Sequence, residues 1–279
     1  MTSPPAPRVP AGLPAPVVPL LTDLVGGLSR IVPELAGTWV YGSIALGAFD
    51  AGTSDIDVIV ATAGRLTARR IDRLAALHAD LAVGHALGSR LEVQYLTLPE
   101  LRGTVPAARY PVYREGAFLR SAQGDLNATT RWVLREHGVT LIGNSPAELS
   151  LGVTWEDVRA AMRWNLTAYW PSYATPGALP LLQDDSVVAW TVATLCRILS
   201  TVVDDVIVTK PAAVEIWAER VPERWSALLR AVRRLHGNAD RRPPARSSHD
   251  RARAVQGFVI WACAAGLAAL DRDRRVPSG

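Results

Sequence analysis

The chain has 279 residues, of which 49% are hydrophobic and 20% are charged, and its formal net charge is +4. This balance is typical of a globular protein and excludes an intrinsically disordered chain. The length is sufficient for two modest domains, each with its own hydrophobic core. The small positive excess fits a partner that carries phosphates, but it is weak evidence because much of it is arginine near the C-terminus.

Cysteine usage and hydropathy indicate a cytoplasmic protein that binds no membrane. Cys196 and Cys263 lie in apolar patterns of helical spacing, so we expect two buried free thiols, as in a reducing compartment. The proline-rich N-terminus lacks the continuous apolar run of a signal peptide. The apolar stretch at residues 257–270 is shorter than the ~20 residues that cross a membrane.

Helical and strand patterns alternate in the first half of the chain. Helical periodicity is expected at residues 20–32, 44–49 and 65–82, and strand patterns at residues 37–43, 54–61 and 90–98. In the last of these strands, alternation places Glu92 and Gln94 on one side, opposite a row of apolar residues. This half therefore predicts an α/β domain.

The second half reads almost entirely as helices. They are expected at residues 126–138, 154–170, 185–203, 210–221, 224–237 and 251–273. Thr154 opens its helix as a capping box, Pro211 suits a first turn, and residues 237–250 read as a polar, arginine-rich loop with no nucleic-acid-binding pattern. We expect a domain boundary near the turn at residues 143–149, which divides the chain into residues 1–145 and 146–279.

Two aspartates stand in the apolar strand at residues 54–61. Asp55 and Asp57 are two positions apart, so both side chains are expected on the same face of the sheet. Two buried carboxylates cost several kcal/mol unless a positive partner meets them. Mg²⁺ is such a partner, because it takes one or two carboxylates together with waters and substrate phosphates.

A phosphate-binding turn precedes the aspartates. Gly42 and Ser43 lie where a strand gives way to a helix, so the backbone N–H groups and the Ser43 hydroxyl can hold a phosphate. Glu92 would add a third carboxylate from the next strand, either as a metal ligand or as the base that takes a proton from an attacking hydroxyl. Alone, an Asp-x-Asp or a Gly-Ser pair is common; their combination indicates a nucleoside triphosphate site.

The stretch "YGSIALGAFDAGTSDIDVIV" resembles the signature of the polymerase-β-like nucleotidyltransferases, whose catalytic domain is built on a mixed sheet. The stretch "TLCRILSTVVDDVIVTKPAAVEIWAERVP" is similar to a helical segment of the aminoglycoside adenylyltransferases that modify streptomycin and spectinomycin. Together the similarities cover most of residues 35–235. They imply an α/β nucleotidyltransferase domain followed by an all-helical C-terminal domain.

The resemblance implies transfer of AMP from ATP to a hydroxyl group of an antibiotic, with release of pyrophosphate. Gly42 and Ser43 would hold the triphosphate, and Glu92 occupies the position of the catalytic base. Asp55 and Asp57 would hold Mg²⁺, with Glu92 as a further candidate ligand. Two cations from the helical domain, Arg197 and Lys210, match residues that reach the nucleotide phosphates. The implied enzyme is a monomer with a small-molecule acceptor and no nucleic-acid partner.

The acceptor is the least defined part of the expected reaction. Streptomycin-modifying members carry an acidic residue and a histidine where this chain has Val187 and Trp190, so we expect spectinomycin rather than streptomycin. Asp184, Asp185 and Glu156 could supply acidic groups from nearby turns, although solvation is the simpler role for each. The same chemistry on a protein or metabolite, and a non-catalytic nucleotide-binding relative, are the alternatives.

Most of the nine tryptophans fit helical packing. Five stand at apolar helical spacings and are expected in the core: Trp132, Trp164, Trp217, Trp225 and Trp261. Tyr169 and Trp170, which precede a proline, fit either packing or the lining of a cleft.

Overall fold

The computed structural model describes residues 9–237 and 248–273 and divides into two compact units between residues 155 and 156. The sequence analysis places the boundary about ten residues earlier, after residue 145. The first eight residues of the proline-rich N-terminus and most of the expected loop at residues 237–250 lie outside the described residues.

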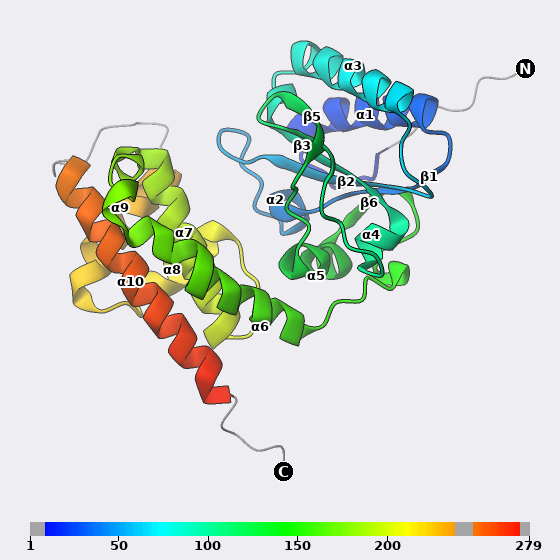
Figure 1. Ribbon diagram of the computed structural model, residues 1–279. Helices are drawn as coiled ribbons and strands as arrows, with labels where there is room; N and C mark the ends of the chain where they lie inside the picture. Colours follow the sequence, from blue (N-terminus) through cyan, green and yellow to red (C-terminus); the bar gives the residue numbers. More distant parts are fainter. Residues whose placement is uncertain (1–8, 238–247, 274–279) are drawn as a thin grey trace, which may run out of the picture. The chain divides into compact units, whose positions relative to one another are not determined.

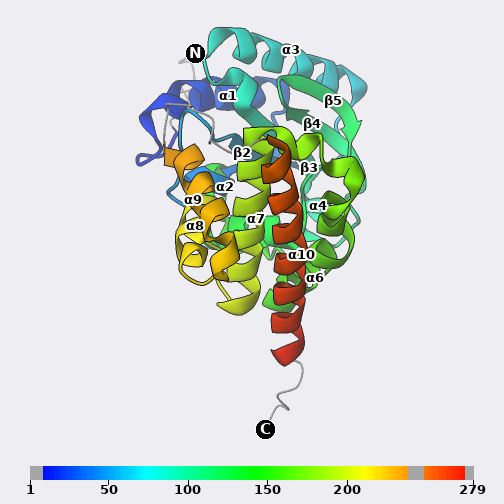
Figure 2. The same cartoon turned by 90° about the vertical axis from the view of Figure 1, so that its left-hand side faces the viewer.

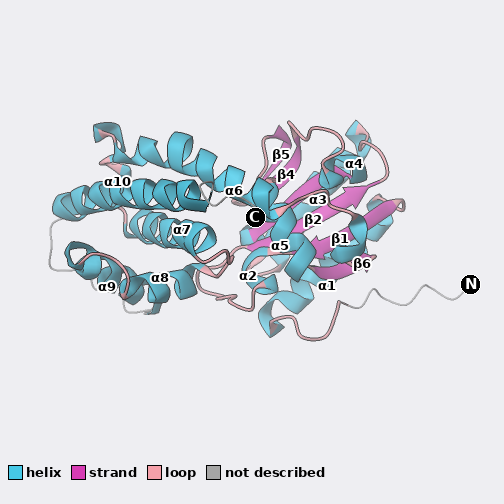
Figure 3. Ribbon diagram, turned by 90° about the horizontal axis from the view of Figure 1, so that it is seen from below, coloured by secondary structure: helices cyan, strands magenta, loops and turns pink. Residues whose placement is uncertain are grey.

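One six-stranded mixed sheet forms the centre of the first unit, in the order β5-β4-β3-β2-β1-β6 (Figure 3). The strands are β1 (Leu35–Val40), β2 (Ile56–Thr62), β3 (Leu91–Thr97), β4 (Tyr110–Arg114), β5 (Ala117–Ala122) and β6 (Val139–Gly143). Strands β2 and β3 are parallel, and every other neighbouring pair is antiparallel. The three strands expected from the sequence are β1, β2 and β3, and the α/β prediction is confirmed.

Helices cover both faces of this sheet. They are α1 (Val18–Ile31), α2 (Gly42–Ala45), α3 (Ala68–Gly84), α4 (Leu98–Arg102) and α5 (Ala128–His137). Helices α1 and α3 lie side by side on one face, and α2 and α5 lie on the other side (Figure 1). Apolar side chains of α1 and α3 pack against Val58, Leu91, Val93 and Tyr95. Because side chains alternate along a strand, the polar side chains between these positions point to the α2 and α5 side.

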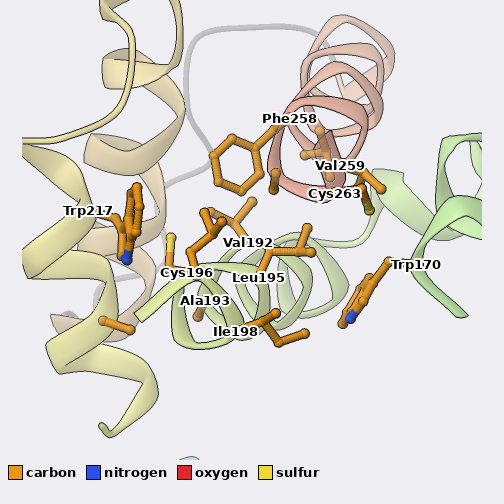
Figure 4. Close-up of a cluster of buried hydrophobic side chains, with 14 of the residues drawn as sticks. Trp170, Val192, Ala193, Leu195, Cys196, Ile198, Trp217, Phe258, Val259 and Cys263 are labelled. Atoms are coloured by element: carbon orange, nitrogen blue, oxygen red, sulfur yellow. The ribbon is translucent and has the colours of Figure 1, made fainter. Parts of the chain in front are cut away.

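The second unit is helical. Its main helices are α6 (Trp155–Trp164), α7 (Asp185–Val203), α8 (Lys210–Ala218), α9 (Glu223–Gly237) and α10 (Ser248–Asp273). Helix α7 contacts α8, α9 and α10, and its apolar side chains occupy the middle of the core between Trp217, Phe258 and Trp170 (Figures 2 and 4). The all-helical prediction for this part is confirmed. Pro211 lies in the first turn of α8, as expected, behind Thr209 as the N-cap.

Two details of the helical unit differ from the sequence-based expectations. The helix expected to reach residue 170 is α-helical only to Trp164 and continues as a π-helical segment, Asn165–Tyr169. Trp164 is 59% exposed, so its assignment to the core is wrong, whereas Trp217 is buried and Trp170 is 1% exposed. Helical spacing identifies one face of a helix, but it does not show whether another element covers that face.

The apolar stretch at residues 257–270 lies within α10, a helix of 26 residues, so the helix expected at residues 251–273 is confirmed. Within the described residues, α7 and α10 are long and apolar enough to span a membrane by length and composition. However, 61% of the apolar window of α7 and 44% of that of α10 are buried inside the structure. Both helices contribute to the core, and Cys196 and Cys263 are buried free thiols on them, as expected.

Candidate active site

A tight turn delivers Asp55 to the start of β2. Asp50 organises this turn, because its side chain accepts from the backbone N–H of Gly52 at 2.6 Å. The backbone N–H of Asp50 donates to the Ser54 hydroxyl at 3.0 Å, and its backbone oxygen accepts from the Ser54 N–H at 2.8 Å. Arg90, at the start of β3, donates to the backbone oxygens of Ala51 and Gly52. The approach to Asp55 is therefore fixed to the strand that carries Glu92.

The register of β2 and β3 places Asp57 directly beside Glu92. The two residues are Cα partners in the parallel ladder, so their side chains leave the same face of the sheet from adjacent strands. This face is the one opposite the α1 and α3 core. The expectation that the strand of Glu92 neighbours the strand of the aspartates is confirmed by this pairing.

The turn at Gly42 and Ser43 lies against the same aspartates. Gly42 has a φ of +65°, and a Cβ atom on it would clash with Oδ2 of Asp57, so only glycine fits here. The backbone N–H of Tyr41 donates to the backbone oxygen of Asp57 at 3.0 Å, and the Ser43 hydroxyl lies 3.5 Å from the backbone oxygen of Asp55. The first turn of α2 is thereby held next to β2.

The aspartates are less buried than the apolar strand pattern suggests. Asp55 precedes β2 and is exposed, while Asp57 and Glu92 are half-buried. The prediction that both aspartates lie within a buried strand is therefore wrong, because the strand begins at Ile56. The desolvation cost is moderate for Asp57 and small for Asp55.

Charge repulsion is concentrated on Glu92. Burial, followed by the nearby negative charges of Asp55, Asp57 and Asp125, raises the pKa of Glu92 to about 7. A carboxylate with a pKa near neutrality can take up a proton at physiological pH and release it again. Burial, followed by the negative charges of Asp57, Asp125 and Glu92, raises the pKa of Tyr41 well above its usual value.

The donor set fits a hard divalent cation. Asp55 and Asp57 offer carboxylate oxygens, and the lack of a side chain on Gly42 lets the Asp57 carboxylate lie directly against the turn. Within residues 9–237 and 248–273, no group of three or more His, Cys, Asp or Glu side chains is arranged to hold a metal ion. Mg²⁺ needs only one or two protein carboxylates when phosphates and waters complete its shell. The assignment of Glu92 as a third ligand stays a prediction.

Three residues near Glu92 were not identified from the sequence as part of the site. Tyr41 precedes the phosphate turn, Gln94 follows Glu92 on the same face, and Asp125 lies between β5 and α5. Gln94 donates to the Tyr41 hydroxyl at 2.7 Å and accepts from the backbone N–H of Asp125 at 3.0 Å. The alternation of β3 was the one available signal for Gln94; the position of Asp125 depends on strand pairing.

The helical unit carries the remaining predicted residues. Arg197 lies in α7 and Lys210 is the first residue of α8, and both side chains are half-buried. Asp184 caps α7 by accepting from the backbone N–H groups of Ser186 and Val187, and the Ser186 hydroxyl, followed by these backbone donors, lowers the pKa of Asp184. Asp185 forms an ion pair with Arg251. Both aspartates therefore have structural roles.

An aromatic cluster surrounds Trp190. Its ring contacts Trp170 and Tyr173, with centroid separations of 5.1 and 5.9 Å, and Tyr169 contacts both of these rings. Trp170 is a packing residue, whereas Trp190 and Tyr169 are 36% and 37% exposed. Val187, one turn before Trp190, packs against the core.

Comparison with known proteins agrees with this architecture. Residues 176–260 match the family model of the aminoglycoside adenylyltransferase C-terminal domain. A crystal structure of spectinomycin adenyltransferase AAD(9) from Enterococcus faecialis with ATP and spectinomycin has a similar fold, with a TM-score of 0.65 and 18% sequence identity. The similarity covers 88% of this chain and 98% of that protein. No curated protein matches the chain in sequence.

The two findings concern different parts of the argument. The structural similarity spans both units and confirms the fold, an α/β unit with a mixed sheet followed by helices. The family match lies within the helical unit, from the turn before α7 to the middle of α10, and includes Arg197 and Lys210. Residues 176–260 are therefore similar to the C-terminal domain of the aminoglycoside adenylyltransferases.

Proposed function

We propose that the protein transfers AMP from ATP to a hydroxyl group of an aminoglycoside-type antibiotic, and that spectinomycin is a better acceptor than streptomycin. The observation that carries the proposal is the parallel register that sets Asp57 beside Glu92, next to the glycine turn at Gly42. The match of residues 176–260 to the C-terminal domain of the aminoglycoside adenylyltransferases supports the reaction class. The similar fold of an enzyme crystallised with ATP and spectinomycin supports the two substrates.

In this reaction, Glu92 acts as the general base. Its carboxylate takes the proton from the acceptor hydroxyl, the hydroxyl oxygen forms a bond to the α-phosphorus of ATP, and the bond to pyrophosphate breaks. The backbone N–H groups of Gly42 and Ser43 hold phosphate oxygens, and Arg197 and Lys210 neutralise their charge. Asp55 and Asp57 would hold Mg²⁺, with Glu92 as a candidate third ligand, and the metal ion supplies further charge neutralisation.

The charges of the helical unit support the preference for spectinomycin. Val187 and Trp190 offer an apolar, aromatic surface where a strongly cationic drug would need carboxylates. The two nearest acidic groups are already used, since Asp184 caps α7 and Asp185 pairs with Arg251. A less charged acceptor does not have to compete for them.

An acceptor screen with labelled ATP and Mg²⁺ tests the proposal. We expect label transfer to spectinomycin, weaker or no transfer to streptomycin, and release of one pyrophosphate for each AMP transferred. The Glu92→Gln variant should bind ATP but lose transfer. Transfer only to a protein or to an unrelated metabolite would contradict the antibiotic acceptor. Absence of transfer to every acceptor, with ATP still bound, would show a nucleotide-binding protein instead.

A further inference from the structure

The side-chain amide of Gln94 joins three separate segments of the α/β unit. Its Nε2 donates to the hydroxyl of Tyr41 at 2.7 Å. Its Oε1 accepts from the hydroxyl of Tyr110 at 2.7 Å and from the backbone N–H of Asp125 at 3.0 Å. The amide therefore connects the end of β1, strand β4 and the segment before α5.

Gln94 lies immediately behind the proposed reaction centre. It is two residues after Glu92 on the same face of β3, and it is 4% exposed. Tyr41, which receives its hydrogen bond, directly precedes Gly42. The buried Gln94 side chain thus connects the strand of the general base to the residue before the turn that is proposed to hold phosphate.

The segment before α5 is pinned at two adjacent amides. The backbone N–H of Leu126 donates to the Tyr110 hydroxyl at 3.3 Å, next to the bond between Asp125 and Gln94. A Cβ atom on Gly124 would clash with the Tyr110 hydroxyl and with the Gln94 amide. This close backbone approach keeps Asp125 near enough to raise the pKa values of both Glu92 and Tyr41.

We propose that Gln94 is a positioning residue for adenylyl transfer, whose amide fixes the Gly42–Ser43 turn and residues 124–126 relative to Glu92. The proposal rests on the proposed function for its kinetic consequence. Its physical basis is that both ends of a buried amide are satisfied at once, so the network has one favourable arrangement. A shift of about 1 Å between a base and a bound substrate can cost about 100-fold in rate.

The Gln94→Met variant, which keeps the side-chain length and removes the hydrogen bonds, tests the proposal. We expect kcat for AMP transfer to fall by about 100-fold, while the Kd for ATP changes much less. Hydrogen exchange at the hydrogen-bonded backbone amides of Tyr41, Ala48, Asp125 and Leu126 should become at least about tenfold faster in the ligand-free protein. The exchange measurement does not depend on any reaction.

Two further variants separate the connections and protect the test if Gln94→Met fails to fold. Tyr41→Phe should speed exchange at the backbone amides of residue 41 and Ala48 and leave Leu126 unchanged. Tyr110→Phe should have the opposite pattern. If neither variant changes exchange at its own segment, the positioning role is overturned.

Tyr95→Phe is the matched control, because Tyr95 lies next to Gln94 on the other face of β3. Its hydroxyl makes one buried hydrogen bond, at 2.6 Å to His78, so its removal should lower stability and leave kcat and exchange at Ala48 unchanged. If Gln94→Met behaves like Tyr95→Phe, Gln94 is only structural and the proposal fails. If the wild-type protein transfers AMP to no acceptor, the proposed function fails, and exchange alone decides whether Gln94 holds the two segments.

Discussion

Acidic side chains crowd together around Glu92, near the start of the interior strand β3, whereas in the helical unit several acidic side chains pair with arginine. Glu92 has its pKa raised to about 7 by burial and by neighbouring carboxylates. In the helical unit, Arg159 contacts Asp205 at 2.6 Å and Arg251 contacts Asp185. The folded state therefore disfavours the ionised form of Glu92, whereas in the helical unit ionised aspartates form ion pairs with arginine. A carboxylate whose pKa is shifted by burial and by neighbouring charges is typical of a functional site.

The largest expected effect is on catalysis by the acidic cluster around Glu92. Asp57→Asn removes a proposed Mg²⁺ ligand beside Glu92, and we expect kcat/KM for AMP transfer to fall by at least about 1,000-fold. Assays with labelled ATP over a range of Mg²⁺ concentrations measure it. Wild-type activity in this variant would mean that Asp57 does not hold the metal ion. Substitution of Asp185 or Asp205, which pair with arginine in the helical unit, should not lower kcat/KM comparably.

The second effect is a loss of stability in the helical unit. Asp185→Asn removes the carboxylate that forms the ion pair with Arg251, a residue that is only 7% exposed. Because the remaining hydrogen bond of this guanidinium to Gln183 does not neutralise its charge, we expect a loss of about 2 kcal/mol. Urea unfolding at pH 7 measures it. Unchanged stability would show that solvent already compensates this arginine.

The opposite sign is expected for Glu92→Gln in the metal-free protein. The folded-state pKa of Glu92 is above its unfolded value, so the ionised carboxylate opposes folding once the pH exceeds about 4.5, most fully above about 7. We expect the variant to be more stable by about 1 kcal/mol at pH 8, after allowance for solvent screening, and equal to wild type at pH 4. Thermal unfolding at the two pH values measures this gain. A loss of stability at pH 8 would contradict the charge crowding.

The smallest effect belongs to a surface pair of the α/β unit. Asp72 contacts Arg120, and both side chains are more than half exposed. Asp72→Asn should change stability by less than about 0.5 kcal/mol and leave AMP transfer unchanged, because exposed pairs contribute little. The variant also serves as the charge-matched control for Asp57→Asn. A large loss of activity in this variant would mean that the rate of AMP transfer depends on the net charge of the unit and not on the position of the carboxylate.

The strongly periodic parts of the chain could be predicted from the sequence. Helix α7 has the expected limits, because its apolar residues repeat at helical spacing. Strands β2 and β3 were visible for a similar reason. Strand β6 was missed because its five residues directly follow α5 and are only partly buried, so they show no clear alternation.

The missed residues of the site have a different cause. Asp125 lies in a loop, and its effect on Glu92 arises only after β3, β4 and β5 have paired. Gln94 was placed on the correct face of its strand, but its bonds to Tyr41 and Asp125 join residues that are 53 and 31 positions away. Such contacts leave no local pattern that a sequence analysis can detect.

The pairing of β1 with β6 has a consequence for how the protein is made. Gly37 is aligned with Gly143, so one side of β1 meets its partner only after more than a hundred further residues have been synthesised. Until β6 emerges from the ribosome, β1 is an open edge that can join the strand of another chain. Ribosomal pausing just after β6 would let the sheet close before the apolar helices α7 and α10 appear.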